Sequence, residues 1–396
     1  MKPLTFLFLI SLFVVLSSCG SSGSQPGKVD LDAIGHQLHL LDKNTKQIIA
    51  DSPDAQLVCP RTINEDGSLR VVSGGDWTSG FFSGTLWYMY EISGDESWKK
   101  KAIDYTQKLE KEQYNGSNHD VGFRMFCSYG NALRLTEDEA YIPVLIQSAN
   151  TLIARYYEEV GCIRSWDFND TVWQCPVIID NMINLELLFW ASEQTDDPVY
   201  GDIAISHALT TMKHHFRDDY STVHVVDYDT ITGEVRQKNT HQGYADESSW
   251  ARGQAWGLYG YTICYRFTKD QRFLEQAEHI AAYLMNNPNL PEDGIPYWDF
   301  NDPGIPEVPR DVSAAAIISS ALYELSTYSD QGESYKLEAE RILMNIWSLY
   351  RSMKGVNYGF ILDHSVGNMP GGSEIDVPIN YADYYFMEAL YRSQKF

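Results

Sequence analysis

The sequence predicts an all-α protein with a single domain, an α/α toroid built from six helical hairpins. Apolar, aromatic-rich helical segments recur along the chain, and a short turn leads from each of them into an amphipathic helical segment. Each turn carries an acidic residue or a glycine, followed by an aromatic residue. Hairpins with an apolar first helix suit a closed double ring, because the first helices can then line the inside of the ring.

The hairpins follow in order along the chain. The first helices of five hairpins are predicted over residues 77–92, 123–135, 179–192, 250–267 and 314–328, and a sixth begins at Asn380. The aromatic residues at the five turns are Trp98, Tyr141, Tyr200, Phe273 and Tyr335. Their spacing is uneven, so insertions separate the hairpins. Residues 222–228 alternate like a strand, and with a turn at Gly233 they predict a small β-hairpin among the loops at one end.

The fourth first helix carries an unusual set of side chains. Glycines at 253, 257 and 260 fall on one face, which must pack close to another backbone. Arg252 and Trp256 share a face because they are four residues apart. Two interpretations are open. In the first, the guanidinium and the indole together bind an acidic sugar. In the second, Trp256 belongs to the core and Arg252 pairs with a structural carboxylate.

Composition limits the possible functions. The chain has 396 residues, of which 44% are hydrophobic, and no polar low-complexity run divides it. The formal net charge of -24 argues against nucleic acid or an anionic membrane surface as a partner. Beyond residue 19 the chain has five cysteines, whose odd number and wide spacing predict neither a disulfide framework nor a zinc site. No nucleotide, phosphate or haem motif is present, so we expect a hydrolase that uses no cofactor and no metal.

The N-terminal residues have the pattern of an export signal. Residues 1–18 resemble a bacterial lipoprotein signal peptide, with a charged start, a short apolar run and small residues before Cys19. An ordinary secretory signal with an incidental cysteine is the alternative. We expect a lipid on Cys19, a flexible tether over residues 19–30 and the barrel domain over 31–396. The protein is then anchored in the cell envelope, periplasmic or at the outer membrane, and meets the membrane only through this lipid.

Two aspartates stand at the starts of predicted inner helices. Asp120 precedes the second of these helices and Asp180 opens the third, and in such a ring the helix N-termini converge on one mouth. Each aspartate is also a candidate helix N-cap. Apolar neighbours of Asp180, including Ile179 and Ile183, are expected to raise its pKa, and a second carboxylate nearby would add to this effect. A carboxyl pair that keeps one proton near neutral pH is what a general acid requires.

A family resemblance is carried by several short motifs. They are Asp-Trp-Thr-Ser-Gly-Phe at 76–81, His119-Asp120, Ile-Asp-Asn-Met at 179–182, His224, Gln242 and Trp-Ala-Arg-Gly-Gln-Ala-Trp at 250–256. In these motifs the chain resembles the unsaturated glucuronyl hydrolases of glycoside hydrolase family 88, and the likeness runs from about residue 77 to residue 385. The resemblance implies the same six-hairpin barrel. It also implies an enzyme that removes a 4,5-unsaturated uronic acid from the non-reducing end of oligosaccharides made by polysaccharide lyases.

The resemblance also implies roles for individual residues. Asp180 would protonate C4 of the unsaturated sugar and then help to deprotonate the water that adds to C5, while Asp120 would bind ring hydroxyls and keep the pKa of Asp180 raised. The remaining substrate-binding residues would be Trp77, His119, His224, Gln242, Arg252, Trp256 and Ser373. Two alternatives stay open: an unsaturated rhamnogalacturonyl hydrolase acting on pectin fragments, and a sugar-binding lipoprotein without catalysis.

Overall fold

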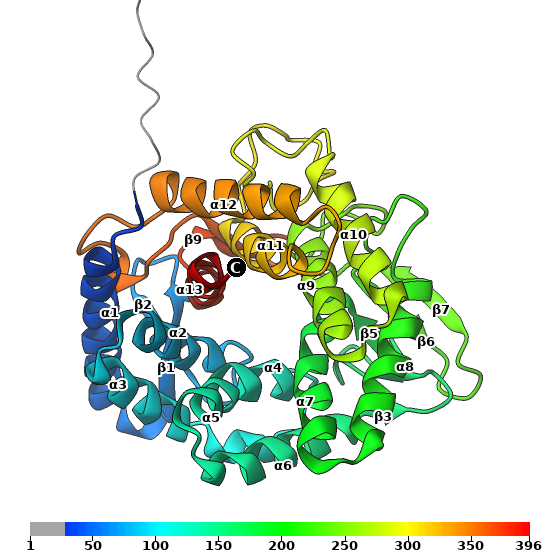
Figure 1. The fold of residues 1–396 in the computed structure, drawn as a ribbon, viewed down its shortest axis with the longest axis horizontal. Helices are drawn as coiled ribbons and strands as arrows, with labels where there is room; N and C mark the ends of the chain where they lie inside the picture. Colours follow the sequence, from blue (N-terminus) through cyan, green and yellow to red (C-terminus); the bar gives the residue numbers. More distant parts are fainter. Residues whose placement is uncertain (1–27) are drawn as a thin grey trace, which may run out of the picture.

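The computed structural model describes residues 28–396, which form a mostly helical single domain (Figure 1). This agrees with the coarse fold prediction. The predicted signal peptide and Cys19 lie outside the described residues. Helix α1 (Leu31–Asp51) begins where the Asp30 carboxylate accepts hydrogen bonds from the backbone amides of Asp32 and Ala33. None of the helices in residues 28–396 is long and apolar enough to cross a membrane.

An inner layer of helices surrounds the centre of the molecule (Figure 1). Its members are α2 (Ser79–Ser93), α4 (Val121–Met125) with α5 (Asn131–Thr136), α7 (Leu185–Thr195), α9 (Ala251–Thr268), α11 (Val312–Leu325) and α13 (Asn380–Lys395). A π-helical turn, η3 (Phe126–Gly130), joins α4 to α5, and a 3₁₀ turn, η5 (Ile179–Asn184), precedes α7. Each inner helix contacts the next one, and α13 contacts α2, so the inner layer closes on itself.

A second layer of helices packs outside the first. It contains α3 (Glu96–Gln107), α6 (Ile142–Ile153), α8 (Pro198–His214), α10 (Gln271–Met285) and α12 (Gly332–Leu349), each of which contacts the inner helix that precedes it in the chain. The acidic turn residues have a structural role, because Asp95, Asp138, Asp197 and Asp270 each accept a hydrogen bond from a backbone amide two residues ahead. The aromatic residues that follow them are buried and anchor the outer helices to the core.

Several elements were not predicted from the sequence. Helix α1 lies in the outer layer and contacts α2 (Figure 1). Four small antiparallel sheets occur in the described part of the chain. They pair β1 (Leu57–Ile63) with β2 (Leu69–Ser73), β3 (Tyr156–Tyr157) with β4 (Cys162–Ile163), β5 (Pro176–Ile178) with β6 (Val225–Tyr228) and β7 (Val235–Asn239), and β8 (Ser365–Asn368) with β9 (Ser373–Val377). The β6–β7 pair confirms the predicted hairpin, with Gly233 at a φ of 72° in its turn. Short turns η1 (Pro53–Ala55), η2 (Glu110–Tyr114), η4 (Glu139–Tyr141) and η6 (Asn357–Gly359) complete the elements.

The glycines of α9 allow a close approach between two backbones. A Cβ atom at Gly260 would lie 2.4 Å from the Cβ of Met182, and one at Gly253 would lie 3.2 Å from a side-chain carbon of Ile179. Both neighbours belong to η5, the turn that carries Asp180. The close backbone contact predicted from the glycine spacing is therefore confirmed at Gly260, and it places η5, which carries Asp180, against α9. At Gly257 the nearest atoms belong to side chains.

Candidate functional site

A pocket of about 220 Å³ opens at the end where the inner helices begin. Six residues predicted from the sequence line it, namely Trp77, Asp120, Asp180, Gln242, Trp256 and Ser373. They come from distant parts of the chain, including the residues before α2 and α4, the turn η5, helix α9 and strand β9. The convergence of inner-helix N-termini thus brings the two predicted aspartates to one cavity.

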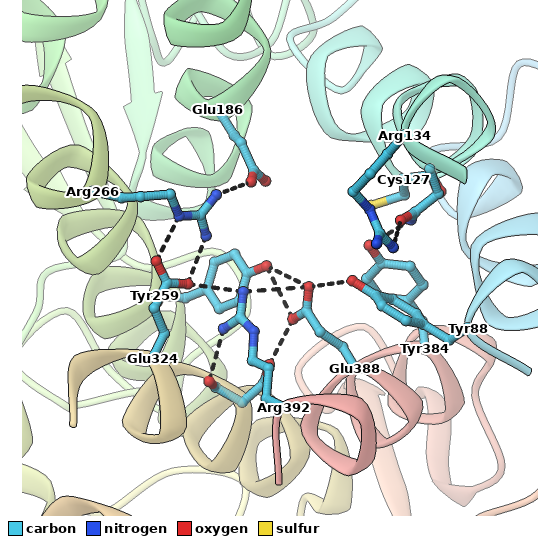
Figure 2. Close-up of polar contacts among 12 residues, drawn as sticks. Tyr88, Cys127, Arg134, Glu186, Tyr259, Arg266, Glu324, Tyr384, Glu388 and Arg392 are labelled. Atoms are coloured by element: carbon cyan, nitrogen blue, oxygen red, sulfur yellow. Dashed lines mark hydrogen bonds and ion pairs between the residues drawn. The ribbon is translucent and has the colours of Figure 1, made fainter. Parts of the chain in front are cut away.

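A larger cavity, of about 570 Å³, lies near the other ends of the inner helices. Five of its charged groups, Glu186, Arg266, Glu324, Glu388 and Arg392, form one network (Figure 2). Arg266 binds Glu186 and Glu324, and Arg392 binds Glu324 at 2.9 Å. Glu388 accepts hydrogen bonds from tyrosines and a serine, Tyr88, Tyr259 and Ser320. Because these groups satisfy one another, the cavity is a structural ion network and the smaller pocket is the candidate site.

The two cavities are neighbours along the centre of the molecule. Phe123 and Ile183 line both of them. These two apolar side chains therefore form part of the floor of the candidate site, and they separate its aspartates from the charged network below.

Asp180 is an acid of the pocket whose pKa is clearly raised. Its side chain is 17% exposed, and Oδ2 has no hydrogen-bond partner among residues 28–396. Burial raises the pKa of Asp180 to about 6, the side chains of Arg252 and His119 oppose this rise, and Asp120 adds to it. A substantial fraction of Asp180 is therefore protonated in mildly acidic solution, as a general acid requires.

Asp120 occupies the N-cap position of α4, but its side chain makes no capping hydrogen bond. Its Oδ1 lies 3.2 Å from Nε2 of the buried His119. The interpretation of Asp120 as a helix cap therefore fails, and its carboxylate belongs to the pocket wall.

His224 lies behind the pocket and orients two of its groups. Its Nδ1 accepts hydrogen bonds from the backbone amides of His241 and Gln242, at 3.0 and 3.1 Å, so a neutral ring carries its proton on Nε2. Burial holds the pKa of His224 well below its usual range, which keeps the ring neutral. Nε2 faces Asp180 Oδ2 at 3.7 Å. His224 thus presents an N–H to the acid and fixes the loop that bears Gln242.

The structure favours the second interpretation of Arg252. Its side chain is 1% exposed, it pairs with Asp311 Oδ2 at 3.0 Å, and it donates to the carbonyl oxygens of Val366 and Gly367. Arg252 is absent from the residues that line the pocket, whereas Gly367 is among them. The guanidinium therefore supports the pocket wall from behind. Trp256 is also buried, yet part of its ring reaches the wall.

A group of ion-paired side chains at the edge of the pocket, here called the clamp, was not predicted from the sequence. Arg61 from β1 binds both carboxylate oxygens of Glu374, at 2.6 and 2.7 Å, and also Asp76 at 2.8 Å. Glu374 follows Ser373 on β9 and has a φ of 55°, an uncommon conformation for a residue with a side chain. The clamp holds the strand that brings Ser373 to the pocket. Its members lie far apart in sequence, so no local pattern reveals it.

Aromatic side chains that were also missed form one side of the pocket. Trp166, Phe168 and His241 line it, and their rings are in mutual contact. Trp166 and Phe168 lie in the long connection between β4 and β5, where no helical or strand period marks them. They provide flat apolar faces of the kind that sugar rings pack against.

Among residues 28–396, neither the cysteines nor the acidic side chains form a further reactive centre. The five cysteines between residues 28 and 396 are buried and unpaired. No group of three or more histidine, cysteine, aspartate or glutamate side chains in that range is arranged to hold a metal ion.

Known proteins resemble this chain in sequence and fold. The chain matches the model of Glycosyl Hydrolase Family 88 over residues 42–289. An unsaturated glucuronyl hydrolase from Formosa agariphila is 47% identical over 100% of this chain and 99% of its own length. The crystal structure of an unsaturated glucuronyl hydrolase specific for heparin is 49% identical, covers 92% of this chain and 96% of that chain, and has a TM-score of 0.87.

A more distant structure contains a bound sugar. It is an aspartate-to-asparagine variant of the unsaturated glucuronyl hydrolase from Streptococcus agalactiae, complexed with dGlcA-GalNAc6S. It is 28% identical, covers 94% of this chain and 96% of that chain, and has a TM-score of 0.74. The family model and the Formosa relative together show that the chain belongs to Glycosyl Hydrolase Family 88.

Proposed function

We propose that the protein removes the terminal 4,5-unsaturated uronic acid from lyase-generated glycosaminoglycan oligosaccharides. The observation that carries this proposal is the placement of Asp120 and Asp180 on one pocket, with the pKa of Asp180 raised to about 6. An acid that holds its proton near this pH, beside a second carboxylate, suits protonation of carbon at the double bond of such a sugar.

The proposed chemistry is hydration rather than displacement at the anomeric carbon. The C4–C5 double bond forms a vinyl ether with the ring oxygen, so transfer of the Asp180 proton to C4 leaves an oxocarbenium-like centre at C5. Water adds to C5 and gives its proton back to the Asp180 carboxylate. The resulting hemiketal opens, and the remaining sugar chain is released. Because C1 is never attacked, the separation of the carboxylates does not predict retention or inversion.

Neutral donors are suited to hold the carboxylate of the substrate. Two arginines at or behind the pocket wall, Arg61 and Arg252, are occupied by Glu374 and Asp311. Gln242 and Ser373 line the pocket and offer an amide and a hydroxyl group. The inner-helix N-termini add partial positive charge at this mouth. We therefore assign recognition of the carboxylate to these neutral groups and to the helix ends.

The relatives support both the site and the substrate class. Structures of the Streptococcus agalactiae enzyme include two single aspartate-to-asparagine variants, whose positions have the same separation along that chain as Asp120 and Asp180 have here. The heparin-specific relative is 49% identical, whereas the unsaturated chondroitin disaccharide hydrolase of Streptococcus agalactiae is 33% identical. Heparin-derived fragments are therefore the first substrates to assay.

We also infer that the closed double layer of helices is an α/α toroid of six hairpins, with α1 as the outer partner of α13.

The test is loss of the ultraviolet absorbance of the conjugated double bond. Purified protein is mixed with unsaturated heparin, chondroitin and hyaluronan disaccharides, and calorimetry with each sugar is run in parallel. Loss of absorbance ranks the substrates and supports the proposal. Binding without loss of absorbance would favour the sugar-binding alternative, and activity restricted to unsaturated rhamnogalacturonan fragments would favour the pectin alternative.

We further propose that Cys19 is lipidated and anchors the enzyme in the cell envelope. The support is the sequence of residues 1–20, which has a charged start, a short apolar run and small residues around Cys19. Metabolic labelling with a fatty acid should mark the wild-type protein. If a Cys19→Ala variant were labelled equally, the assignment of the lipid to Cys19 would be wrong.

A further inference from the structure

Helix α4 begins without a cap from its own N-cap side chain. Asp120, at that position, has a φ of -66° and a ψ of -10°, which are helical values. The aspartates that cap other helices are extended there, with ψ of 111° at Asp95, 114° at Asp197 and 117° at Asp270. A capping side chain favours the extended conformation, because it can then reach the amides of the first turn. The backbone therefore turns the Asp120 carboxylate away from α4, and this carboxylate lines the pocket.

A residue from another segment accepts the hydrogen bond that Asp120 leaves unmade. The backbone amide of Phe123, in the first turn of α4, donates to Oδ1 of Asn184 at 2.8 Å. Asn184 belongs to η5, the turn that also carries Asp180. An N-cap side chain normally accepts from the second or third helical amide, and Phe123 supplies the third. Asn184 therefore takes the place of an N-cap side chain from outside the helix, and it satisfies an amide that would be costly to bury alone.

The side-chain amide of Asn184 is held in one orientation. Its Nδ2 donates to Oδ1 of Asn181 at 2.9 Å, and Nδ2 of Asn181 donates to the carbonyl oxygen of Ile163 at 2.8 Å. Both asparagine side chains are fully buried. Because the nitrogen of Asn184 is used by Asn181, its oxygen is the group that faces the amide of Phe123.

A glycine at position 122 allows α4 and η5 to meet. A Cβ atom at Gly122 would lie 2.4 Å from Oδ1 and 2.7 Å from Cβ of Asn184. Both distances are shorter than real Cβ contacts, so any larger residue at position 122 would push Asn184 away from Phe123. Gly122 and Asn184 therefore hold the start of α4 against η5, and with these segments they hold Asp120 and Asp180.

We propose that Asn184 is a positioning residue that caps α4 in place of Asp120, so that the Asp120 carboxylate is free to face the sugar. The inference rests on the proposed hydrolase function, in which Asp120 contacts the substrate. The side chain of Asn184 is fully buried, so it acts through Asp120 and not on the sugar itself. Without Asn184, the first turn of α4 takes Asp120 as its cap and draws the carboxylate out of the pocket.

The first test compares melting temperatures and needs no substrate. Asp197→Ala removes the cap of α8 and should lower Tm by about 1–2 °C, whereas Asp120→Ala should not lower it. In an Asn184→Ala background, Asp120→Ala should lower Tm by about 1–2 °C, because Asp120 then supplies the cap. Equal effects of Asp120→Ala in the two backgrounds would overturn the proposal. If Asn184→Ala does not fold, a fall in Tm for Asp120→Ala as large as that for Asp197→Ala would overturn it.

The second test measures kcat/KM well below the melting temperatures, with a matched control. Asn131 is a buried asparagine of α5 that donates to the carbonyl oxygen of Cys127 at 2.9 Å and lines the larger cavity. Asn184→Ala should lower kcat/KM by about 100-fold, as expected when a group that contacts the substrate is displaced, while Asn131→Ala should match the wild type. Equal losses in both variants, or no loss in Asn184→Ala, would overturn the proposal. If the wild type consumes no unsaturated disaccharide, the proposed function fails, and the melting temperatures still decide the role of Asn184.

Discussion

Replacing Asp180 with asparagine should stabilise the protein at neutral pH while removing its activity. Burial raises the pKa of Asp180 from its ordinary value of 3.8 to about 6, so the folded state binds this proton more tightly than the unfolded state does. The stability that this residue contributes is therefore fully present below pH 3.8 and is lost as the pH rises to 6. At 1.36 kcal/mol per pKa unit, ionised Asp180 costs the folded state about 3 kcal/mol.

The neutral isostere avoids this cost. Urea unfolding at pH 7.5 should show Asp180→Asn to be more stable than the wild type by up to about 3 kcal/mol, which corresponds to about 4 °C in Tm for a chain of this length. At pH 4 the difference should shrink to less than about 1 kcal/mol, because the wild-type carboxyl is then protonated in the folded state. Equal stability of the two proteins at pH 7.5, or a gain that does not depend on pH, would refute the account of a desolvated acid.

Three further predictions concern the pH dependence of catalysis and the buried ionic contacts of Arg252 and Glu388. The kcat/KM of the wild type should fall about tenfold per pH unit above pH 6, because only protonated Asp180 donates; a profile that stays flat to pH 8 would contradict this. Arg252→Met should lower the free energy of unfolding by about 3–5 kcal/mol in urea titrations, because Asp311 is left buried and unpaired. A raised KM with unchanged stability would instead indicate direct substrate contact. Glu388→Gln should cost about 2 kcal/mol in the same titrations and leave kcat/KM unaltered, since the charged network lies below the floor of the pocket; a changed kcat/KM would link the two cavities.

The helical part of the fold was predictable because its signals are local. Periodic apolar residues marked the inner helices, and the turn aspartates, such as Asp95 and Asp270, cap the helices that follow them. Helix α1 was missed because it comes before the first recognised hairpin and is followed by the short turn η1 and strand β1 rather than by a second amphipathic helix. The sheets at β1–β2 and β8–β9 were missed because β1 and β9 lack clear alternation of buried and exposed residues.

The site residues were predictable where an acidic residue stands at the start of an inner helix. Asp120 and Asp180 stand at such positions, and the ring brings them together. The clamp of Arg61 with Glu374 joins residues separated by 313 positions, so only the folded chain reveals it. The role of Arg252 could not be decided from the sequence for the same reason. Its partner Asp311 lies 59 positions away, and this ion pair decides between the two interpretations of the guanidinium.

The central claim is that Asp180 supplies the proton that starts the reaction. The most direct measurement follows the absorbance of the double bond in an unsaturated heparin disaccharide at pH 6, using the wild type, Asp180→Asn and Glu186→Gln. Glu186 is a matched control, because burial raises its pKa as well but it belongs to the cavity below the floor. The account predicts loss of absorbance with the wild type and Glu186→Gln, and a rate at least 1,000-fold lower, roughly the contribution of a general acid, with Asp180→Asn. A rate for Asp180→Asn within tenfold of the wild type would contradict it.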